Sequence, residues 1–389
     1  MKNNRTFLEK LLDGAEVEWK PLIKVASLTR GRVISKEYLA NNLGDYPVYS
    51  SQTVNNGEIG KINSFDFDGE FVSWTTDGAN AGTVFYRSGK FSITNVCGLI
   101  KIQNNFELNY KFLFYWLSIE AKNHVYSGMG NPKLMSHQME KILIPIPPLS
   151  VQTEIVRILD ALTALTSELT SELILRRKQY EYYREKLLSE EELEKVGFEW
   201  RGLGEICKKV SSGGTPLSTK DEYYNGNIPW LRTQEVQFNE IWDTEVKITQ
   251  DGLNNSSAKW IPENCVIVAI SGATAGRSAI NKIALTTNQH CCNLQIAHEY
   301  ANYRYVFHWV CKEYEKLKSL GQGARADLNS GIIKNYPIAL PPLEEQQRIV
   351  SILDKFENLT NSITEGLPLA IEQSQKRYEY YRELLLNFS

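Results

Sequence analysis

The sequence has no excess of basic residues and no long apolar run. Lys and Arg number 43 against 46 Asp and Glu, which gives a formal net charge of −3. Proteins that bind DNA by bulk electrostatics normally carry a clear positive excess, so any DNA binding must be local or shared with partners. No stretch is long enough to span a bilayer, and residues 1–10 lack the apolar core of a signal peptide. We therefore expect a cytoplasmic protein that makes no membrane contact.

The motifs of metal sites and of common catalytic machinery are also missing. The six cysteines and five histidines show no zinc-binding spacing. Gly57–Lys61 has the wrong spacing for a phosphate-binding loop, and Asn131–Leu134 lacks the second proline and the aromatic of an amino-methyltransferase motif. His290 beside Cys291 fits the end of a buried strand better than a nucleophile pair. We predict no catalytic residue, no metal and no cofactor in this chain.

What the chain does contain is an internal repeat. Ile144–Asp160 reappears as Ile338–Asp354, and both copies carry the pattern Pro-Pro-Leu-x-x-Gln-x-x-Ile-Val. Each copy continues to a Tyr-Glu-Tyr-Tyr-Arg-Glu ending, at 180–185 and at 378–383. A different segment of more than a hundred residues precedes each copy. One frame that holds two different readers suits a bipartite target better than a single catalytic pocket.

Both copies carry the apolar spacing of a coiled coil. In the first, steps of four and three residues connect Val151, Ile155, Ile158, Leu162, Leu165 and Leu169. Two helices with matching seams are expected to pack on each other; the alternative is that each packs on its own neighbouring domain. The residues predicted to form the spacer helices and their interfaces are Ile155, Leu162, Leu169, Leu173, Tyr180, Tyr183, Ile349, Phe356, Leu359, Tyr378 and Tyr381.

The two copies differ in length by four residues. Leu149 and Leu343 are 194 positions apart, whereas Tyr180 and Tyr378 are 198 apart. The extra residues are expected near Gly366-Leu-Pro368, which should break or kink the second helix. At the matching point the first copy repeats Thr-Ser-Glu-Leu twice, over residues 166–173. Four residues are just over one helical turn, so such a unit can adjust the length of the helix.

The segments before the two copies share an outline. Gly78–Gly82 reads Gly-Ala-Asn-Ala-Gly and Gly272–Gly276 reads Gly-Ala-Thr-Ala-Gly, and β-rich runs alternate with glycine-rich turns around both. We predict a mixed α/β fold with two globular domains built on twisted β-rich sheets. Two long antiparallel helices that form a coiled coil are expected to separate them.

The order of the segments is cyclic. Phe7–Leu12 is similar to Arg184–Leu188, so we expect the chain to begin with the tail of a helix whose body lies at the C-terminus. The result would be a molecule with a pseudo-two-fold axis, the symmetry that a duplex requires of a reader with two half-sites. The predicted segments are an N-terminal helical segment at 1–14, domain 1 at 15–147, a central helix at 148–190, domain 2 at 191–341 and a C-terminal helix at 342–389.

These motifs identify a resemblance. The two Pro-Pro-Leu-x-x-Gln helices, the Tyr-Glu-Tyr-Tyr-Arg endings and the paired Gly-Ala-x-Ala-Gly segments resemble the specificity subunit of type I restriction–modification enzymes, over essentially the whole chain. The resemblance implies that each globular domain is a target-recognition domain for one half of a split DNA sequence. It also implies that the helices set the spacer and recruit two modification (methyltransferase) subunits, to which two restriction subunits bind. S-adenosylmethionine, ATP and Mg²⁺ would then be bound by these partners, and the chain itself would not be an enzyme.

Base reading requires side chains that donate and accept hydrogen bonds, carried on loops that approach DNA closely. The candidates in domain 1 are Ser50, Ser51, Gln52, Thr76, Asn80 and, more weakly, Lys133. Those in domain 2 are Arg232, Thr233, Gln234, Ser271, Thr274, Arg277, Gln322 and Arg325. Each of them could instead lie in an ordinary solvated turn. Because the two sets differ in composition, we expect an asymmetric bipartite site.

Two other functions fit parts of the sequence. One is a methyltransferase or nuclease whose motifs have drifted, although Asn131–Leu134 argues against it. The other is a scaffold whose domains bind protein, which the negative net charge favours and the polar, glycine-rich loops do not.

Overall fold

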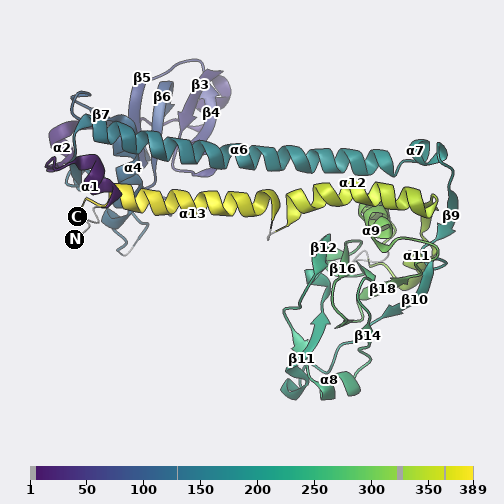
Figure 1. Ribbon diagram of the computed structural model, residues 1–389. Coiled ribbons are helices and arrows are strands. Elements are labelled where there is room, and N and C mark those ends of the chain that lie inside the picture. The colour runs from purple at the N-terminus through teal and green to yellow at the C-terminus, as the bar shows by residue number, and fades with distance from the viewer. Residues whose placement is uncertain (1–5, 129, 322–326, 363–364, 389) are drawn as a thin grey trace. The chain divides into compact units, whose positions relative to one another are not determined.

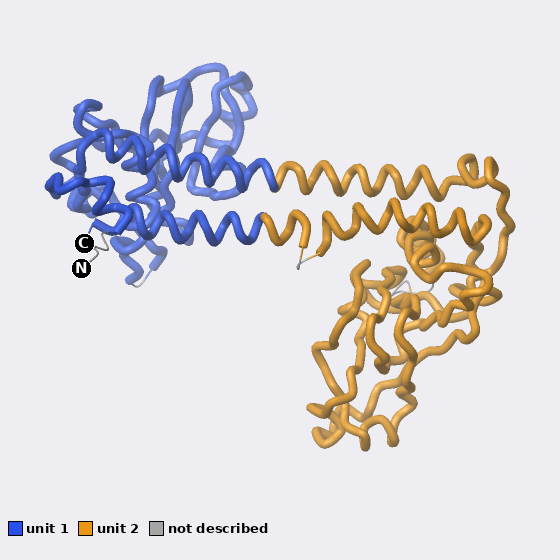
Figure 2. Tube along the Cα trace, in the orientation of Figure 1, with its two compact units in different colours: residues 1–169, 371–389 blue, residues 170–370 orange. Residues whose placement is uncertain are grey.

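The computed structural model describes residues 6–128, 130–321, 327–362 and 365–388, and it divides the chain into two compact units. Unit 1 contains residues 1–169 and 371–389, and unit 2 contains residues 170–370 (Figure 2). Unit 1 is therefore assembled from both ends of the chain, whereas unit 2 is one continuous stretch. No helix in the described ranges has the length and apolarity needed to cross a bilayer.

Unit 1 is built around a six-stranded sheet of order β2-β7-β5-β6-β3-β4, in which only the β3–β6 pair is parallel (Figure 1). A separate ribbon pairs β1 with β8. Its elements are α1 (Phe7–Leu12), β1 (Glu18–Pro21), α2 (Leu22–Val25), β2 (Ala26–Arg30), α3 (Lys36–Asn41), β3 (Leu43–Tyr49), β4 (Glu58–Ile62), β5 (Phe67–Thr75), β6 (Val84–Ile93), β7 (Cys97–Ile102), α4 (Tyr110–Glu120), α5 (Ser136–Met139), β8 (Leu143–Ile146), the first part of α6 (Leu149–Leu187) and most of α13 (Gly366–Leu386).

Unit 2 contains a five-stranded sheet of order β10-β18-β15-β16-β12, a four-stranded sheet of order β13-β11-β17-β14 and a β9–β19 ribbon. Its elements after α6 are α7 (Glu190–Glu194), β9 (Glu199–Gly202), β10 (Cys207–Ser212), β11 (Tyr224–Leu231), β12 (Asn239–Ile241), β13 (Lys247–Ile248), α8 (Gln250–Asn254), β14 (Trp260–Ile261), β15 (Val266–Ala269), β16 (Ser278–Asn281), β17 (Leu285–Thr287), β18 (Cys291–Ile296), α9 (Tyr303–Lys312), α10 (Tyr314–Ser319), α11 (Ser330–Asn335), β19 (Pro337–Leu340) and α12 (Leu343–Asn361).

The two units share one antiparallel plan. Strands β2-β7-β5-β6 of unit 1 follow the same order and direction as β10-β18-β15-β16 of unit 2. Helix α4 contacts β5 and β6, as α9 contacts β15 and β16. The apolar faces of α4 and α9, which include Phe112 and Trp309, are buried in the two largest cores. The predicted mixed α/β fold with two β-rich domains is confirmed.

The long helices make two kinds of contact within each unit. Their first turns pack on the globular domain: Ile155 of α6 is buried in the core of unit 1, and Ile349 of α12 in that of unit 2. Further along, helix meets helix, since the hydroxyls of Thr166 and Ser374 lie 2.8 Å apart in unit 1 and the Tyr183 and Phe356 rings stack at 5.3 Å in unit 2. Each unit thus combines the two arrangements considered from the sequence.

The expected interruption of the second helix is present. Helix α12 ends at Asn361 and α13 begins at Gly366, which has a φ of +81°. A Cβ at Gly366 would lie 2.7 Å from the carbonyl oxygen of Asn358, so only glycine fits this turn. The first helix, α6, continues without a break for 39 residues.

The prediction for the N-terminal segment is wrong in one respect. Helix α13 ends at Leu386, and α1 begins separately with a capping box formed by Thr6 and Glu9. The counterpart of α1 is α7, which Ser189 caps after the end of α6. The similarity to Arg184–Leu188 was a match to the wrong helix. Both chain ends nevertheless meet in unit 1, where Leu8 shares a core with Leu385.

Candidate nucleic-acid interface

The same glycine turn connects two strands in each unit. Gly78 and Gly82 lie between β5 and β6, Gly272 and Gly276 lie between β15 and β16, and all four have φ between +75° and +87°. The amide of Gly82 donates to the carbonyl of Thr75 at 2.9 Å, and that of Gly276 donates to the carbonyl of Ala269 at 2.8 Å. The repeated Gly-Ala-x-Ala-Gly pattern is thus explained by a backbone that residues with a Cβ rarely adopt.

A second loop lies beside each glycine turn. In unit 1 the Asn80 side chain donates a 3.0 Å hydrogen bond to the carbonyl of Ser51, which follows β3. In unit 2 the turn at Thr233–Glu235, which follows β11, contacts Gly272–Thr274. The structure therefore brings Ser50–Gln52 together with Thr76–Asn80 in domain 1, and Arg232–Gln234 together with Ser271–Arg277 in domain 2, which are two of the three segments predicted there.

The predicted residues of unit 1 are mostly engaged with one another or with the backbone. Thr94 donates to the hydroxyl of Ser50 at 2.9 Å, and the Gln52 amide donates to the carbonyl of Glu58. Thr76 is fully buried and donates to Asp77 at 2.7 Å. Of the remaining predicted residues of unit 1, Ser51 and Asn80 are half-buried, whereas Lys133 is exposed.

In unit 2 the predicted arginines have different surroundings. Arg232 forms a 2.7 Å salt bridge with Glu245 and lies 3.7 Å from Glu235, so its guanidinium group is already paired with two carboxylates of the same unit. Arg277 is half-buried, and its Nε has no hydrogen-bond partner among the described residues. Ser271, Thr274 and Thr233 are half-buried and Gln234 is exposed. Gln322 and Arg325 lie outside the described residues.

Two further arginines of unit 1 belong to this edge and were missed from the sequence. Arg30, at the end of β2, donates to the carbonyl of Asn95 at 2.6 Å and lies 3.8 Å from Asp77. Arg87 of β6 is buried beneath the Ser50–Gly57 loop, where it donates to the carbonyl of Asn56 at 2.8 Å and its guanidinium lies 3.6 Å from the centre of the Tyr49 ring. Burial lowers the pKa of Arg87 to about 10. Strand pairing brings both residues to the loops, and no local sequence signal marks them.

Other groups that could suggest chemistry have structural explanations. Cys291 is fully buried at the start of β18, and burial raises the pKa of its thiol, so it is held protonated. His308, Asp354 and Glu357 are the one described cluster with metal-ligand spacing. Arg304 already bridges the carboxylates at 2.7 and 2.5 Å, so the cluster is a satisfied ionic network.

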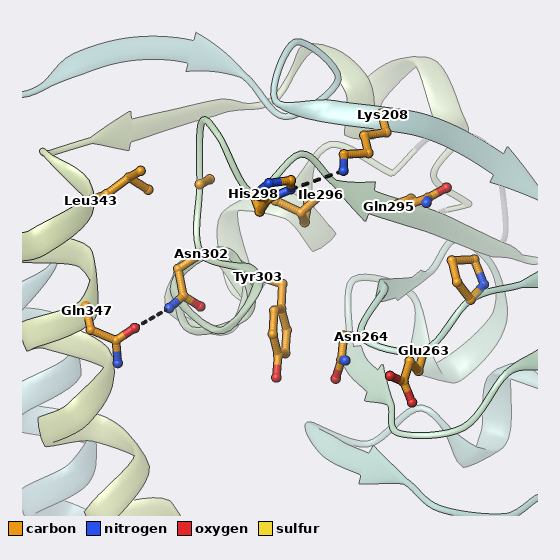
Figure 3. Close-up of a pocket in the computed structure, with 12 residues that line it drawn as sticks. Lys208, Glu263, Asn264, Gln295, Ile296, His298, Asn302, Tyr303, Leu343 and Gln347 are labelled. Carbon is orange, nitrogen blue, oxygen red and sulfur yellow. Dashed lines mark hydrogen bonds between the residues drawn. The ribbon is translucent and has the colours of Figure 1, made fainter.

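Unit 2 also has an open cavity of about 490 Å³ beside the start of α9 (Figure 3). Lys208 lies 3.1 Å from Nδ1 of His298 on one side, and Asn302 donates to Gln347 at 2.9 Å on the other. Glu263, Asn264 and Tyr303 are among its other lining residues. The lining is mainly polar and comes from β10, β18, the start of α9 and α12, together with the residues that precede β15.

Comparison with known proteins agrees with this architecture. The family model described as the type I restriction modification DNA specificity domain matches twice, at residues 15–176 and 195–373. The chain belongs to this family. A putative type I restriction enzyme specificity subunit of Haemophilus influenzae is 40% identical, with both chains covered completely. The EcoR124I/EcoR124II specificity subunit of Escherichia coli is 37% identical over 98% of this chain and 97% of that protein.

Solved structures from type I restriction–modification systems share the fold. The S subunit of a type I restriction–modification system from M. genitalium has a TM-score of 0.64 at 14% identity and covers 99% of this chain and 97% of its own. A chain from work on complex assembly of the type I system has a TM-score of 0.57 at 16% identity and covers 96% and 98%. The prediction of a non-catalytic specificity subunit is confirmed by the family and by its named relatives.

Proposed function

We propose that this chain is the DNA-reading subunit of a type I restriction–modification complex and that each unit reads one half of an asymmetric bipartite site. The observation that carries the proposal is the repeated loop edge: the same glycine turn and neighbouring loop recur with different side chains. Asn80 and Ser51 occupy it in unit 1, and Thr274 and Gln234 occupy it in unit 2. A shared frame with unlike side chains is the arrangement needed to read two different sequences.

Affinity for DNA then depends on an assembly rather than on this chain alone. Its net charge of −3 provides little of the phosphate neutralisation that DNA binding requires. We infer that two modification subunits, recruited through the helices α6, α12 and α13, surround the double-stranded DNA, and that two restriction subunits join them. These partners would bind S-adenosylmethionine, ATP and Mg²⁺, and the complex would act in the cytoplasm.

The decisive experiment maps methylated bases in DNA from cells that express this chain with its modification subunit. The expected result is one asymmetric sequence in two parts with a fixed gap, and no methylation when this chain is omitted. Methyl transfer by the purified chain without any partner would instead support the drifted-enzyme alternative. Methylation that does not depend on this chain would favour the scaffold.

A further inference from the structure

The buried glutamines of the repeat, Gln152 and Gln346, make the same three contacts in both units. In unit 1 the Gln152 amide nitrogen donates to the carbonyls of Pro147 and Glu107, both at 2.8 Å, and its oxygen accepts from the backbone amide of Asn109 at 2.9 Å. These three partners come from two segments. Pro147 lies in the proline pair before α6, and Glu107 and Asn109 lie in the loop that leads into α4, with Asn109 as its N-cap.

Unit 2 repeats the arrangement with Gln346. Its nitrogen donates to the carbonyls of Pro341 at 2.9 Å and Tyr300 at 3.4 Å, and its oxygen accepts from the amide of Asn302 at 2.9 Å. Asn302 is the N-cap of α9, as Asn109 is of α4. Gln152 and Gln346 are 0% and 1% exposed. We call each set of contacts a glutamine clamp.

The clamps supply directional interactions between helix and domain, which the surrounding apolar core cannot provide. Apolar packing between the first turns of a long helix and a domain, as made by Ile155 and Ile349, is non-directional and tolerates small rotations. Hydrogen bonds to three backbone groups have preferred distances and angles. Because each clamp joins the helix, the proline pair and the α4 or α9 N-terminus, it fixes the direction in which the domain leaves its helix.

We propose that Gln152 and Gln346 are positioning residues for the spacing of the bipartite site. This inference rests on the proposed function, because the spacing matters only if each unit reads DNA. Neighbouring spacer lengths differ by about 3.4 Å and roughly 35° along the duplex. A domain held rigidly on its helix should bind its half-site only at the native spacer length. A domain that can pivot should also bind when the spacer is one base pair longer or shorter.

The test uses the assembled complex with Gln152→Met and Gln346→Met, which keep side-chain length but remove every clamp hydrogen bond. Gln347→Ala is the control for α12, because Gln347 is the exposed neighbour of Gln346 and contacts Asn302 only through a hydrogen bond from the Asn302 side chain (Figure 3). Thr153→Ala is the control for α6, because this exposed side chain bonds only to the carbonyl of Leu149 in its own helix. Methylation rates are measured on duplexes with the native spacer and with one base pair more or fewer.

Each methionine variant should keep both half-site sequences and lower the preference for the native spacer by on the order of tenfold, equivalent to about 1.4 kcal/mol. The controls should leave the preference unchanged. Equal loss of methylation on all spacers would show that the clamps only maintain the fold, and would overturn the inference. If a methionine variant does not assemble, the shorter amides Gln152→Asn and Gln346→Asn replace it, and an unchanged preference in these would overturn it equally. Absence of site-specific methylation by the unaltered complex would instead reject the proposed function.

Discussion

Units 1 and 2 have the same frame, but the ion pairs that connect the globular domain to its long helix differ between them. In unit 1, Asp160 of α6 accepts from Lys111 at 2.5 Å and from Tyr115 at 2.7 Å, and the Lys111 side chain is 40% exposed. In unit 2 the equivalent Asp354 accepts from Arg304 and His308, whose side chains are 10% and 0% exposed. The same aspartate position of the repeat thus forms a partly exposed ion pair in unit 1 and belongs to a buried ionic network in unit 2.

This difference shows which parts of the repeat are fixed. The glutamine clamps and the glycine turns are the same because they depend on backbone geometry, which both units share. The ion pairs of Asp160 and Asp354 differ because several combinations of donor side chains can satisfy the hydrogen bonds of one carboxylate. The predicted DNA-binding loops differ most in side chain, because their shared contacts to the frame are made largely by the backbone of the glycine turns.

The largest expected effect comes from removing the cation that pairs with the helix aspartate in each unit. Arg304→Met should destabilise unit 2 by about 3–5 kcal/mol, because it leaves Asp354 and Glu357 without their cation in a buried site. Lys111→Met should cost unit 1 only about 0–1 kcal/mol, since both members of its ion pair are more than a third exposed to water. Amide hydrogen exchange of the intact chain, followed in α9 for unit 2 and in α4 for unit 1, measures the loss of stability in each variant. Similar losses of protection in the two variants would contradict the contrast.

A smaller effect should separate the two reading edges. Arg277→Ala in unit 2 and Asn80→Ala in unit 1 should each relax one half-site and leave the other unchanged. A lost base contact typically costs about 1–3 kcal/mol of discrimination. Methylation maps of complexes that contain each variant would show which half changes. A variant that weakens both halves equally would indicate a contact to phosphate instead.

The most subtle change should move the units apart without altering either. A third Thr-Ser-Glu-Leu unit inserted after Leu173 adds about 6 Å of rise and roughly 40° of twist to α6. The twist is close to that of one base pair, so the spacer should lengthen by one while both half-sites and the stability stay the same. The map of methylated sites gives the gap directly, and an unchanged gap would reject the idea that α6 measures length.

The repeat made most of the frame predictable. Periodicity located α6 and α12, the four-residue difference located the break before Gly366, and the glycine patterns located both turns. These signals are local, or they are visible because the sequence states them twice. The loop edge was predicted only in part, since Arg30 and Arg87 reach it through strand pairings with Gly98 and Phe71, which no local sequence pattern reveals. Nor did the repeat reveal that carboxylates hold Arg232, because Glu245 lies on a different segment.

The discontinuity of unit 1 has a consequence for biosynthesis. A ribosome completes residues 170–370 in one uninterrupted stretch, so unit 2 has all of its own parts as soon as that stretch has emerged. Unit 1, although it is translated first, lacks Leu385 and Leu386 of its core until residues 371–389 arrive. The domain made earliest should therefore be the last to complete its core, and a released chain truncated after residue 370 should show a protease-resistant second half beside a sensitive first half.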